Sequence, residues 1–222
     1  MSKILVTGGA TGLGALIVKH LENDGHQVYV YDIASGDDVL NPNVSEIPEI
    51  DVLINNAGKN DIGWLADFTS ESWDKVMDVN AKGIFMMTKA LLPQLKASRG
   101  TVLNIVSNAA HRPMRCSSAY NASKGAALML TKQLARELND DGITVFSVSP
   151  NKLAGTDMSA YIDKRVVETR GWDEETARNY QLNGLAAGEE TDPEAVAEFI
   201  AFLLASKKRH KYLVGCDMPY GL

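Results

Sequence analysis

The amino-acid sequence predicts an α/β fold in which a doubly wound, mostly parallel sheet forms a single domain. Short apolar runs, many of them β-branched, recur along the chain, and longer segments with helical periodicity separate most of them. The runs are almost wholly apolar, which is typical of strands whose sheet is covered by helices on both faces. The candidate strands are residues 4–7, 28–31, 52–54, 101–106, 143–148 and 212–214.

Helical patterns fill most of the intervals between these runs. The helical candidates are residues 12–23, 71–97, 118–139 and a segment that starts at residues 191–194. Pro93 lies within the second candidate and is expected to kink or end that helix. Pro193 stands at the first position of the last candidate, which suits a proline. The cations of KKRHK (207–211) are expected to end a helix, where positive charge complements the helix dipole.

One interval is too short for the usual connection between parallel strands. Only eighteen residues lie between VYVYD (28–32) and DVLINNAG (51–58). This length allows a turn and a small strand at residues 37–40 but hardly a full crossover helix. We therefore expect a shortened crossover after the second strand, with a helix missing on that flank of the sheet.

Length and composition narrow the class of protein. The 222 residues are enough for one well-buried domain, spanning residues 1–222, and short for two. The net charge of −6 argues against a protein that binds nucleic acid. No apolar run approaches the ~18 residues that cross a membrane, and the first strand begins too early to leave room for a signal peptide. Cys116 and Cys216 are far apart and have no metal-site spacing, so we expect no disulfide framework, no metal and a cytoplasmic location.

A glycine cluster, TGGATGLG (7–14), follows the first candidate strand and opens the first candidate helix. Gly8, Gly12 and Gly14 would allow a tight turn and let a pyrophosphate approach bare backbone, where helix amides favour negative charge. Asp32 ends the second candidate strand, eighteen residues after Gly14, close to the spacing of an acid that binds a ribose diol. The pattern favours a dinucleotide site, although a sharp strand-to-helix turn and a solvated acid at a strand end would use the same residues.

A tyrosine and a lysine share one face of a candidate helix. Tyr120 and Lys124 are four residues apart in SAYNASKG (118–125), so both side chains point the same way. A free phenol has a pKa near ~10, and an ammonium ~4 Å away at an effective dielectric of ~20 favours the phenolate by roughly 4 kcal/mol. We therefore expect Lys124 to bring the pKa of Tyr120 near 7, which would make it a proton donor or acceptor. Considered alone, the pair also fits an amphipathic helix surface.

Three motifs in this order, TGGATGLG, NNAG (55–58) and YNASK, resemble the short-chain dehydrogenase/reductase family, and the resemblance covers essentially the whole chain. It implies a Rossmann-like fold and a catalytic set of Asn80, Ser107, Tyr120 and Lys124. In this scheme Tyr120 exchanges a proton with the substrate oxygen, and Ser107 orients and stabilises that oxygen. Lys124 also binds the nicotinamide ribose, and Asn80 positions a water that links Lys124 to solvent.

The resemblance further implies cofactor contacts along the strand ends. The implied cofactor-binding residues are Gly8, Gly12, Leu13, Gly14, Asp32, Asp38, Val39, Asn56, Ala57, Gly58, Tyr120, Lys124, Pro150, Leu153 and Thr156. The sequence departs from the family after the strand at residues 143–148, where Asn151 replaces a glycine and Thr156 falls one residue late. The terminal VGCDMPYG also lacks the paired glycines often found there.

The implied reaction is hydride transfer between NAD(H) and a small-molecule secondary alcohol or ketone. Asp32 would accept both ribose hydroxyls but repel a 2′-phosphate, and its neighbours supply no compensating cation, so NADP is less favoured. These neighbours are Ala10, Thr11, Ile33 and Ala34. A dinucleotide-binding regulatory protein without turnover is the alternative, and a sugar-nucleotide epimerase relative would normally need a longer C-terminal substrate domain. The resemblance also implies a homo-oligomer, a tetramer or dimer, built on the two long helices.

Two further regions are expected to border the substrate. Residues 155–190 are expected to form a lid within the domain, either mobile or fixed as a helical cap. The loop after the fourth candidate strand carries His111, Arg112 and Arg115, and Lys152 follows the fifth. If these arginines and the lysine converge, they would attract a carboxylated or phosphorylated substrate. A solvated loop explains them equally well.

Overall fold

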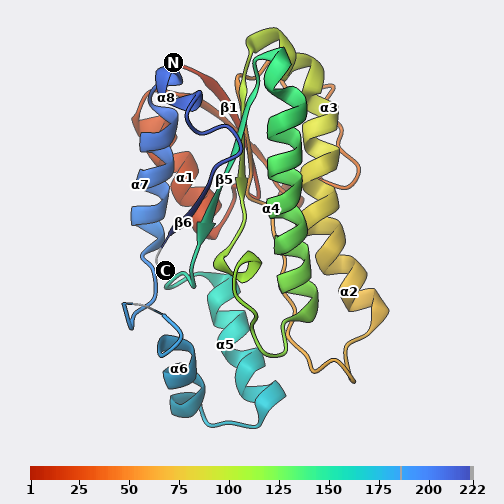
Figure 1. Cartoon of the computed structure of the whole chain (residues 1–222), viewed down its shortest axis with the longest axis vertical. Coiled ribbons are helices and arrows are strands. Elements are labelled where there is room, and N and C mark those ends of the chain that lie inside the picture. The colour runs from red at the N-terminus through yellow and green to blue at the C-terminus, as the bar shows by residue number, and fades with distance from the viewer. Residues whose placement is uncertain (186, 221–222) are drawn as a thin grey trace.

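The computed structural model describes residues 1–185 and 187–220, and within these ranges six parallel strands form one sheet (Figure 1). The strands are β1 (Lys3–Thr7), β2 (Gln27–Tyr31), β3 (Val52–Asn55), β4 (Thr101–Ile105), β5 (Thr144–Pro150) and β6 (Asp217–Tyr220). Their order across the sheet is β2-β1-β3-β4-β5-β6, so the direction of winding reverses between β1 and β3. In such sheets ligands bind outside the carboxyl ends of the strands, at this reversal.

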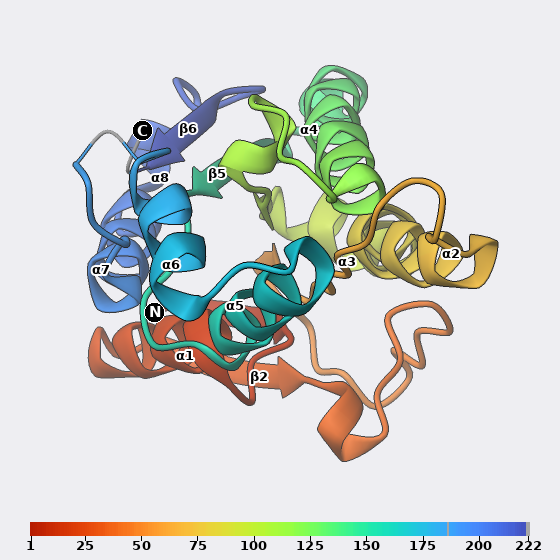
Figure 2. The same cartoon turned by 90° about the horizontal axis from the view of Figure 1, so that it is seen from below.

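Helices cover both faces of the sheet, as predicted (Figures 1 and 2). They are α1 (Gly12–Asn23), α2 (Ser70–Met77), α3 (Gly83–Ser98), α4 (Ser118–Leu138), α5 (Asp157–Arg170), α6 (Glu174–Leu182), α7 (Pro193–Leu204) and α8 (Lys207–His210). Successive strand residues point to opposite faces: Ile4 and Val6 enter the core under α1 and α7, whereas Leu5 enters the core under α3 and α4. The predicted α/β fold is confirmed. None of the described helices combines the length and apolar character that a membrane span requires.

The connection from β2 to β3 is short, as expected, and contains only a 3₁₀ turn at Ile33–Ser35 in place of a crossover helix. The small strand expected at residues 37–40 is wrong, because this fully described stretch forms turns. Asp38 Oδ1 accepts the backbone N–H of Leu40 at 2.9 Å, and such a local bond competes with extended pairing. The loop still covers the flank, since Val44 and Ile47 pack against the core there.

The long helical candidate at 71–97 is divided, but not at its proline. α2 and α3 are joined by a π-helical turn at Asp78–Lys82. Pro93 was expected to kink or end this helix; it lies inside α3, which continues to Ser98, so the helix does not end there. Pro93 has no N–H to donate to the carbonyl of Lys89, four residues earlier. Both residues are exposed, so water can donate to that carbonyl instead.

The C-terminal prediction is also wrong in two details. Residues 212–214 form a turn, and the last strand is β6 at residues 217–220. The run YLV looked like a strand because it is apolar, yet Tyr212 is exposed and Leu213 packs as an isolated anchor on the core. The cations of 207–211 do not end α7, which stops at Leu204; residues 207–210 form the separate short helix α8.

Candidate active site

The glycine cluster forms the turn between β1 and α1, and two of its glycines are required by backbone packing. A Cβ on Gly14 would lie 2.0 Å from the carbonyl oxygen of Gly8, and a Cβ on Gly8 would lie 2.8 Å from the Cα of Ala57. Gly12 differs because its nearest neighbour leaves room for a side chain: a Cβ there would lie 3.9 Å from the Cβ of Thr156, an ordinary contact distance. The glycine loop and the segment after β5 therefore face each other at the carboxyl edge of the sheet. Leu13 is buried in the core, so it offers a ligand only its backbone.

The NNAG segment holds this loop in place. The hydroxyl of Thr7 accepts the backbone N–H groups of Asn56 and Ala57, both at 3.0 Å. The Asn56 side chain donates to the carbonyl oxygens of Thr7 at 3.1 Å and Gly8 at 2.8 Å. Gly58 continues toward the catalytic candidates, since a Cβ on it would lie 3.8 Å from Lys124 Nζ.

The acid at the end of β2 is buried and bonded to backbone on two sides. Asp32 Oδ2 accepts the N–H of Ala10 in the glycine loop, and Oδ1 accepts the N–H of Ala34, both at 2.9 Å. The carboxylate therefore ties the glycine loop to the 3₁₀ turn. Each oxygen retains acceptor capacity for a further donor.

The two residues matched to an adenine-contacting pair lie in the loop that follows. Asp38 accepts the N–H of Leu40 and, at 3.0 Å, the side-chain amide of Asn41. The Val39 side chain packs on the core beside Gly83, where a Cβ would meet it at 2.9 Å. Both side chains are thus engaged by the protein itself.

Three of the four catalytic candidates meet where β4 ends and α4 begins. The Ser107 hydroxyl is a hydrogen-bond partner of the Tyr120 phenol and accepts the N–H of Ala109 at 3.1 Å. Lys124 is buried, with Nζ 5.8 Å from the centre of the Tyr120 ring. Its ammonium donates to the carbonyl oxygen of Ile105 at 2.9 Å. The helical spacing of Tyr120 and Lys124 places them as predicted.

The expected effect of Lys124 on Tyr120 is wrong in this structure. Burial raises the pKa of the Tyr120 phenol, and the hydrogen bond with Ser107 lowers it by less. Burial also lowers the pKa of Lys124 from 10.5 to about 8. Attraction between the two charges favours the phenolate, but both groups also lose water on burial, and here desolvation is the larger effect.

Asn80, the fourth candidate, joins two segments through its side-chain hydrogen bonds. It lies in the π-helical turn between α2 and α3, a geometry often found at functional sites. Its Oδ1 accepts the N–H of Lys59 at 2.7 Å, and its Nδ2 donates to the Lys59 carbonyl at 2.8 Å and to Ser123 Oγ at 2.9 Å. It therefore joins the loop after β3 to α4, one residue from Lys124.

The segment after β5 closes the other side of the site. Pro150 ends the strand, and the N–H of Asn151 donates to the carbonyl of Tyr220 at 2.9 Å. Leu153 pairs with Thr191 and packs on the core. Thr156 caps α5 by accepting the N–H of Ser159 at 3.2 Å. These bonds fix the segment opposite Gly12.

Residues 155–190 contain α5 and α6, which lie beyond the carboxyl ends of the strands (Figures 1 and 2). Residue 186 of this range lies outside the described residues. Trp64 Nε1 donates to the carbonyl of Thr169 at 2.9 Å, and Arg165 donates to the carbonyl of Ile62 at 2.8 Å. A polar cleft of about 340 Å³ lies along this contact, and no catalytic candidate lines it. These bonds dock α5 on the loop after β3, and Ala177 of α6 shares a buried apolar cluster with Ile62 of that loop.

The three cations expected to attract an anionic substrate are each engaged by other groups of the protein. Lys152 Nζ lies 2.5 Å from Asp163 and 2.7 Å from Glu190. Arg112 donates to the carbonyl of Gly184 at 2.9 Å, and the guanidinium of Arg115 lies 5.3 Å from the ring centre of Trp64. All three interact with residues of 155–190 or of the loop after β3. The sequence could not show which acids and carbonyls would be brought to them.

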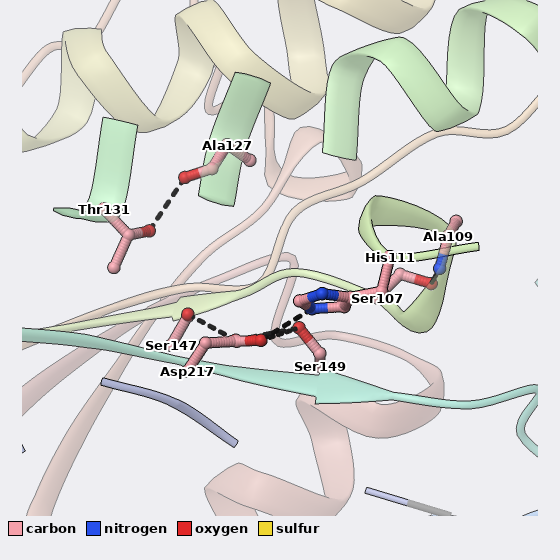
Figure 3. Close-up of polar contacts among 8 residues, drawn as sticks. All are labelled: Ser107, Ala109, His111, Ala127, Thr131, Ser147, Ser149 and Asp217. Carbon is pink, nitrogen blue, oxygen red and sulfur yellow. Dashed lines mark hydrogen bonds and ion pairs between the residues drawn. The ribbon is translucent and has the colours of Figure 1, made fainter. Parts of the chain in front are cut away.

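One hydrogen-bonded network was not predicted from the sequence (Figure 3). Asp217 in β6 accepts the hydroxyls of Ser147 and Ser149 and lies 2.7 Å from Nε2 of His111. A signal was present in ITVFSVSP, where two serines at alternate positions of an apolar strand face the same side of the sheet. Buried hydroxyls require hydrogen-bond partners, so they indicated a polar group on the neighbouring strand.

The chain is similar to known proteins over most of its length. A family model described as short chain dehydrogenase matches residues 34–166. The chain belongs to the short-chain dehydrogenase/reductase family. It is 34% identical over 194 residues to the ketoacyl reductase assigned to the monensin polyketide synthase of Streptomyces virginiae, covering 84% of this chain and 74% of that protein. It is 28% identical over 246 residues to sorbitol-6-phosphate 2-dehydrogenase of Klebsiella pneumoniae, covering 96% and 91%.

Solved structures of other proteins have the same fold. Actinorhodin polyketide ketoreductase, solved with NADPH, superimposes with a TM-score of 0.87 at 26% identity, covering 99% of this chain and 95% of that one. NAD⁺-bound xylitol dehydrogenase superimposes with a TM-score of 0.88 at 21% identity, covering 98% and 96%. The chain thus belongs to a family of oxidoreductases, and it shares its fold with one protein solved with NADPH and another solved with NAD⁺.

Proposed function

We propose that this short-chain dehydrogenase/reductase is an NAD(H)-dependent enzyme that interconverts a secondary alcohol and a ketone. The observation that carries the proposal is the meeting of Ser107, Tyr120 and Lys124 at the carboxyl edge of the sheet, beside the glycine loop. When bound, the nicotinamide supplies or accepts the hydride. Residues of this chain bind the cofactor, hold the substrate oxygen and transfer the proton.

The residues of the carboxyl edge suit a dinucleotide. The glycine loop presents backbone at the start of α1, where amide groups favour a pyrophosphate, and Gly12 lies close to Thr156 of the segment after β5. We assign the ribose of the adenosine half to Asp32 and the adenine surroundings to Asp38 and Val39. The remaining proposed contacts come from Gly8, Leu13, Gly14, Asn56, Ala57, Gly58, Pro150, Leu153 and Thr156.

In the proposed chemistry Tyr120 transfers the proton. Its phenol exchanges a proton with the substrate oxygen, which the Ser107 hydroxyl holds by a second hydrogen bond. The ammonium of Lys124 favours the phenolate when that proton leaves, and it also binds the nicotinamide ribose. Because burial raises the pKa of Tyr120, the phenol remains protonated until substrate and cofactor complete the site. We assign Asn80 the role of holding Lys59 and α4 in register around Lys124.

The proposed preference for NAD(H) rests on Asp32. A ribose diol can donate to the acceptor sites that remain on its carboxylate, whereas a 2′-phosphate would place negative charge against it. The backbone groups that flank the carboxylate belong to Ala10 and Ala34, which carry no charge. The solved relatives contain NADPH as well as NAD⁺, so the preference is a property proposed for this chain.

We also propose a cytoplasmic homo-oligomer, a tetramer or dimer, with residues 155–190 as a substrate lid. Cys116 and Cys216 are both free thiols, as expected in a reducing compartment. Phe85 on α3 and Met129 on α4 are exposed apolar side chains on the helices assigned to the interface. Light scattering coupled to size-exclusion chromatography would give the number of subunits.

The test of function is turnover of NAD(H) and NADP(H) on a panel of ketones and secondary alcohols, including hydroxy and ketoacyl compounds. We expect oxidation or reduction of the nicotinamide with at least one member, at higher kcat/KM with NAD(H). Cofactor binding by calorimetry without any turnover on the panel would favour a dinucleotide-binding regulatory protein instead.

A further inference from the structure

His111 and Asp217 are joined across the sheet edge although they are far apart in the chain. His111 Nε2 lies 2.7 Å from Asp217 Oδ2, and the side chain of Asp217 is only 7% exposed. An ionised carboxylate only accepts hydrogen bonds, so Nε2 carries the hydrogen. Figure 3 shows the imidazole directed at the carboxylate from the turn that contains Ser107.

Asp217 is held rigidly by the strand beside it. Ser147 donates to Oδ1 at 2.5 Å, and Ser149 lies 2.8 Å from Oδ1 and 3.0 Å from Oδ2. Both serines are fully buried, and Ser147 is the register partner of Asp217 in the parallel β5–β6 pair. The carboxylate thus offers His111 an anchor whose own position is fixed by the sheet.

His111 in turn ends the short turn that begins at Ser107. This turn is the 3₁₀ helix Asn108–Ala110, and the N–H of His111 donates to the carbonyl of Asn108 at 2.9 Å. At its start, the N–H of Ala109 donates to Ser107 Oγ at 3.1 Å. One acceptor site of the Ser107 hydroxyl is therefore occupied by the turn, which leaves its hydrogen and its other lone pair for Tyr120 and the substrate oxygen.

We propose that His111 and Asp217 are positioning residues for Ser107. Their contact fixes the far end of the Asn108–Ala110 turn against β6, so the Ala109 N–H keeps the Ser107 hydroxyl aimed at Tyr120. This role rests on the proposed oxidoreductase function, and neither residue touches the reacting atoms. Loss of the contact loosens the turn and misdirects the hydroxyl while the cofactor site, formed by other strand ends, keeps its shape.

The kinetic test compares His111→Ala, His111→Gln and the control His26→Ala, whose imidazole accepts the N–H of Ser2 near the opposite end of β1. We expect kcat to fall roughly 10-fold in His111→Ala, because small misplacements of a catalytic group slow the reaction strongly. Glutamine can place an amide N–H near the position of Nε2, so the kcat of His111→Gln should lie within about threefold of the wild-type kcat. The Kd of the cofactor should be unchanged in all three. A loss of cofactor affinity that matches the loss of kcat would overturn the positioning role.

A double-mutant cycle with Ser107→Ala tests whether His111 affects kcat through Ser107. If His111 acts through Ser107, adding His111→Ala to Ser107→Ala should change kcat by less than about twofold. A further fall as large as in the wild-type background would overturn the proposal, because the histidine would then act independently of the serine.

Amide hydrogen exchange separates this proposal from the proposed function. In His111→Ala the amides of Ala109 and His111 should exchange at least about 10-fold faster than in wild type, with those of β4 unchanged. Unchanged exchange in the turn would overturn the proposal whatever the kinetics show. If the wild-type protein turns over no member of the panel, the proposed function fails, and the exchange result still decides whether the pair fixes the turn.

Discussion

Nζ of Lys124 lies 2.9 Å from the carbonyl oxygen of Ile105, where β4 ends. This hydrogen bond fixes a buried ammonium between α4 and the sheet, beside the ring of Tyr120. Burial lowers the pKa of Lys124 to about 8. The residue that was expected to tune its neighbour is thus itself strongly affected by its surroundings, and this has measurable consequences for stability.

Lys124 should make the protein relatively more stable as the pH rises from about 8 to about 10.5. In this window the unfolded chain still binds the proton at its ordinary pKa of 10.5, whereas the folded protein has released it. Stability increases with pH wherever the unfolded state binds more protons. Urea titrations at about pH 7.5 and about pH 10 would measure the free energy of unfolding of wild type and of Lys124→Met. The value for wild type minus the value for the variant should be larger at the higher pH. A constant or falling difference would contradict the lowered pKa.

Tyr120→Phe should lose on the order of 10²-fold or more in kcat, because the group that transfers the proton is removed. The Kd of the cofactor should be preserved, since the phenol hydroxyl is a small part of that site. Tyr212→Phe is the matched control, because this tyrosine is exposed in the turn before β6 and lies outside the proposed site. An active Tyr120→Phe enzyme with an unchanged pH profile would exclude Tyr120 as the acid or base.

Asp32→Ala should reduce cofactor discrimination and stability together. The variant loses the acceptor for two backbone N–H groups, those of Ala10 and Ala34, which costs about 1–3 kcal/mol of unfolding free energy. It also loses the charge that opposes a 2′-phosphate, so the ratio of kcat/KM for NAD(H) over NADP(H) should fall. Equal efficiency with both cofactors in wild type, and no change in the variant, would contradict the assignment.

Gly14→Ala and Gly125→Ala should have opposite effects on stability. A Cβ on Gly14 meets the Gly8 carbonyl oxygen at 2.0 Å, whereas a Cβ on Gly125 in α4 meets nothing within 4 Å. The first variant requires the backbone of the glycine loop to shift, and we expect a loss of about 2 kcal/mol or more together with weaker cofactor binding. The second gains helix propensity, by up to about 1 kcal/mol. Thermal unfolding of the two variants would check this, and a stable Gly14→Ala with normal cofactor affinity would count against the described loop.

Lys152→Met should loosen the lid region, because it removes the ion pairs to Asp163 on α5 and to Glu190 beyond α6. The Lys152 side chain is 14% exposed, so its charge is well shielded from solvent. Lys164→Met is the control, because this lysine lies on α5 like Asp163 but is 76% exposed and 3.9 Å from Glu168. Limited proteolysis should cut residues 155–185 faster in the first variant only. Equal cutting of both variants and wild type would show that the two ion pairs do not hold the lid.

Much of the framework was predictable because it depends on neighbours along the chain. Apolar β-branched runs predicted five of the six described strands, β1 to β5, and the spacing of Tyr120 and Lys124 predicted their shared helix face. The missing crossover helix followed from the length of one interval. The glycine loop followed from a short motif whose geometry is set by local backbone constraints, and the structure shows why Gly8 and Gly14 are needed.

The rest depended on which residues the fold brings together. β6 contains Asp217 and Pro219, so its local pattern does not indicate a strand, and Asp217 becomes acceptable there only because Ser147, Ser149 and His111 donate to it. Lys152 was expected to face a substrate and instead pairs with two acids. The pKa of Tyr120 moved opposite to expectation because its burial is a property of the packed core. Local propensity and spacing can be inferred from the sequence, whereas desolvation and long-range pairing arise only when distant segments pack.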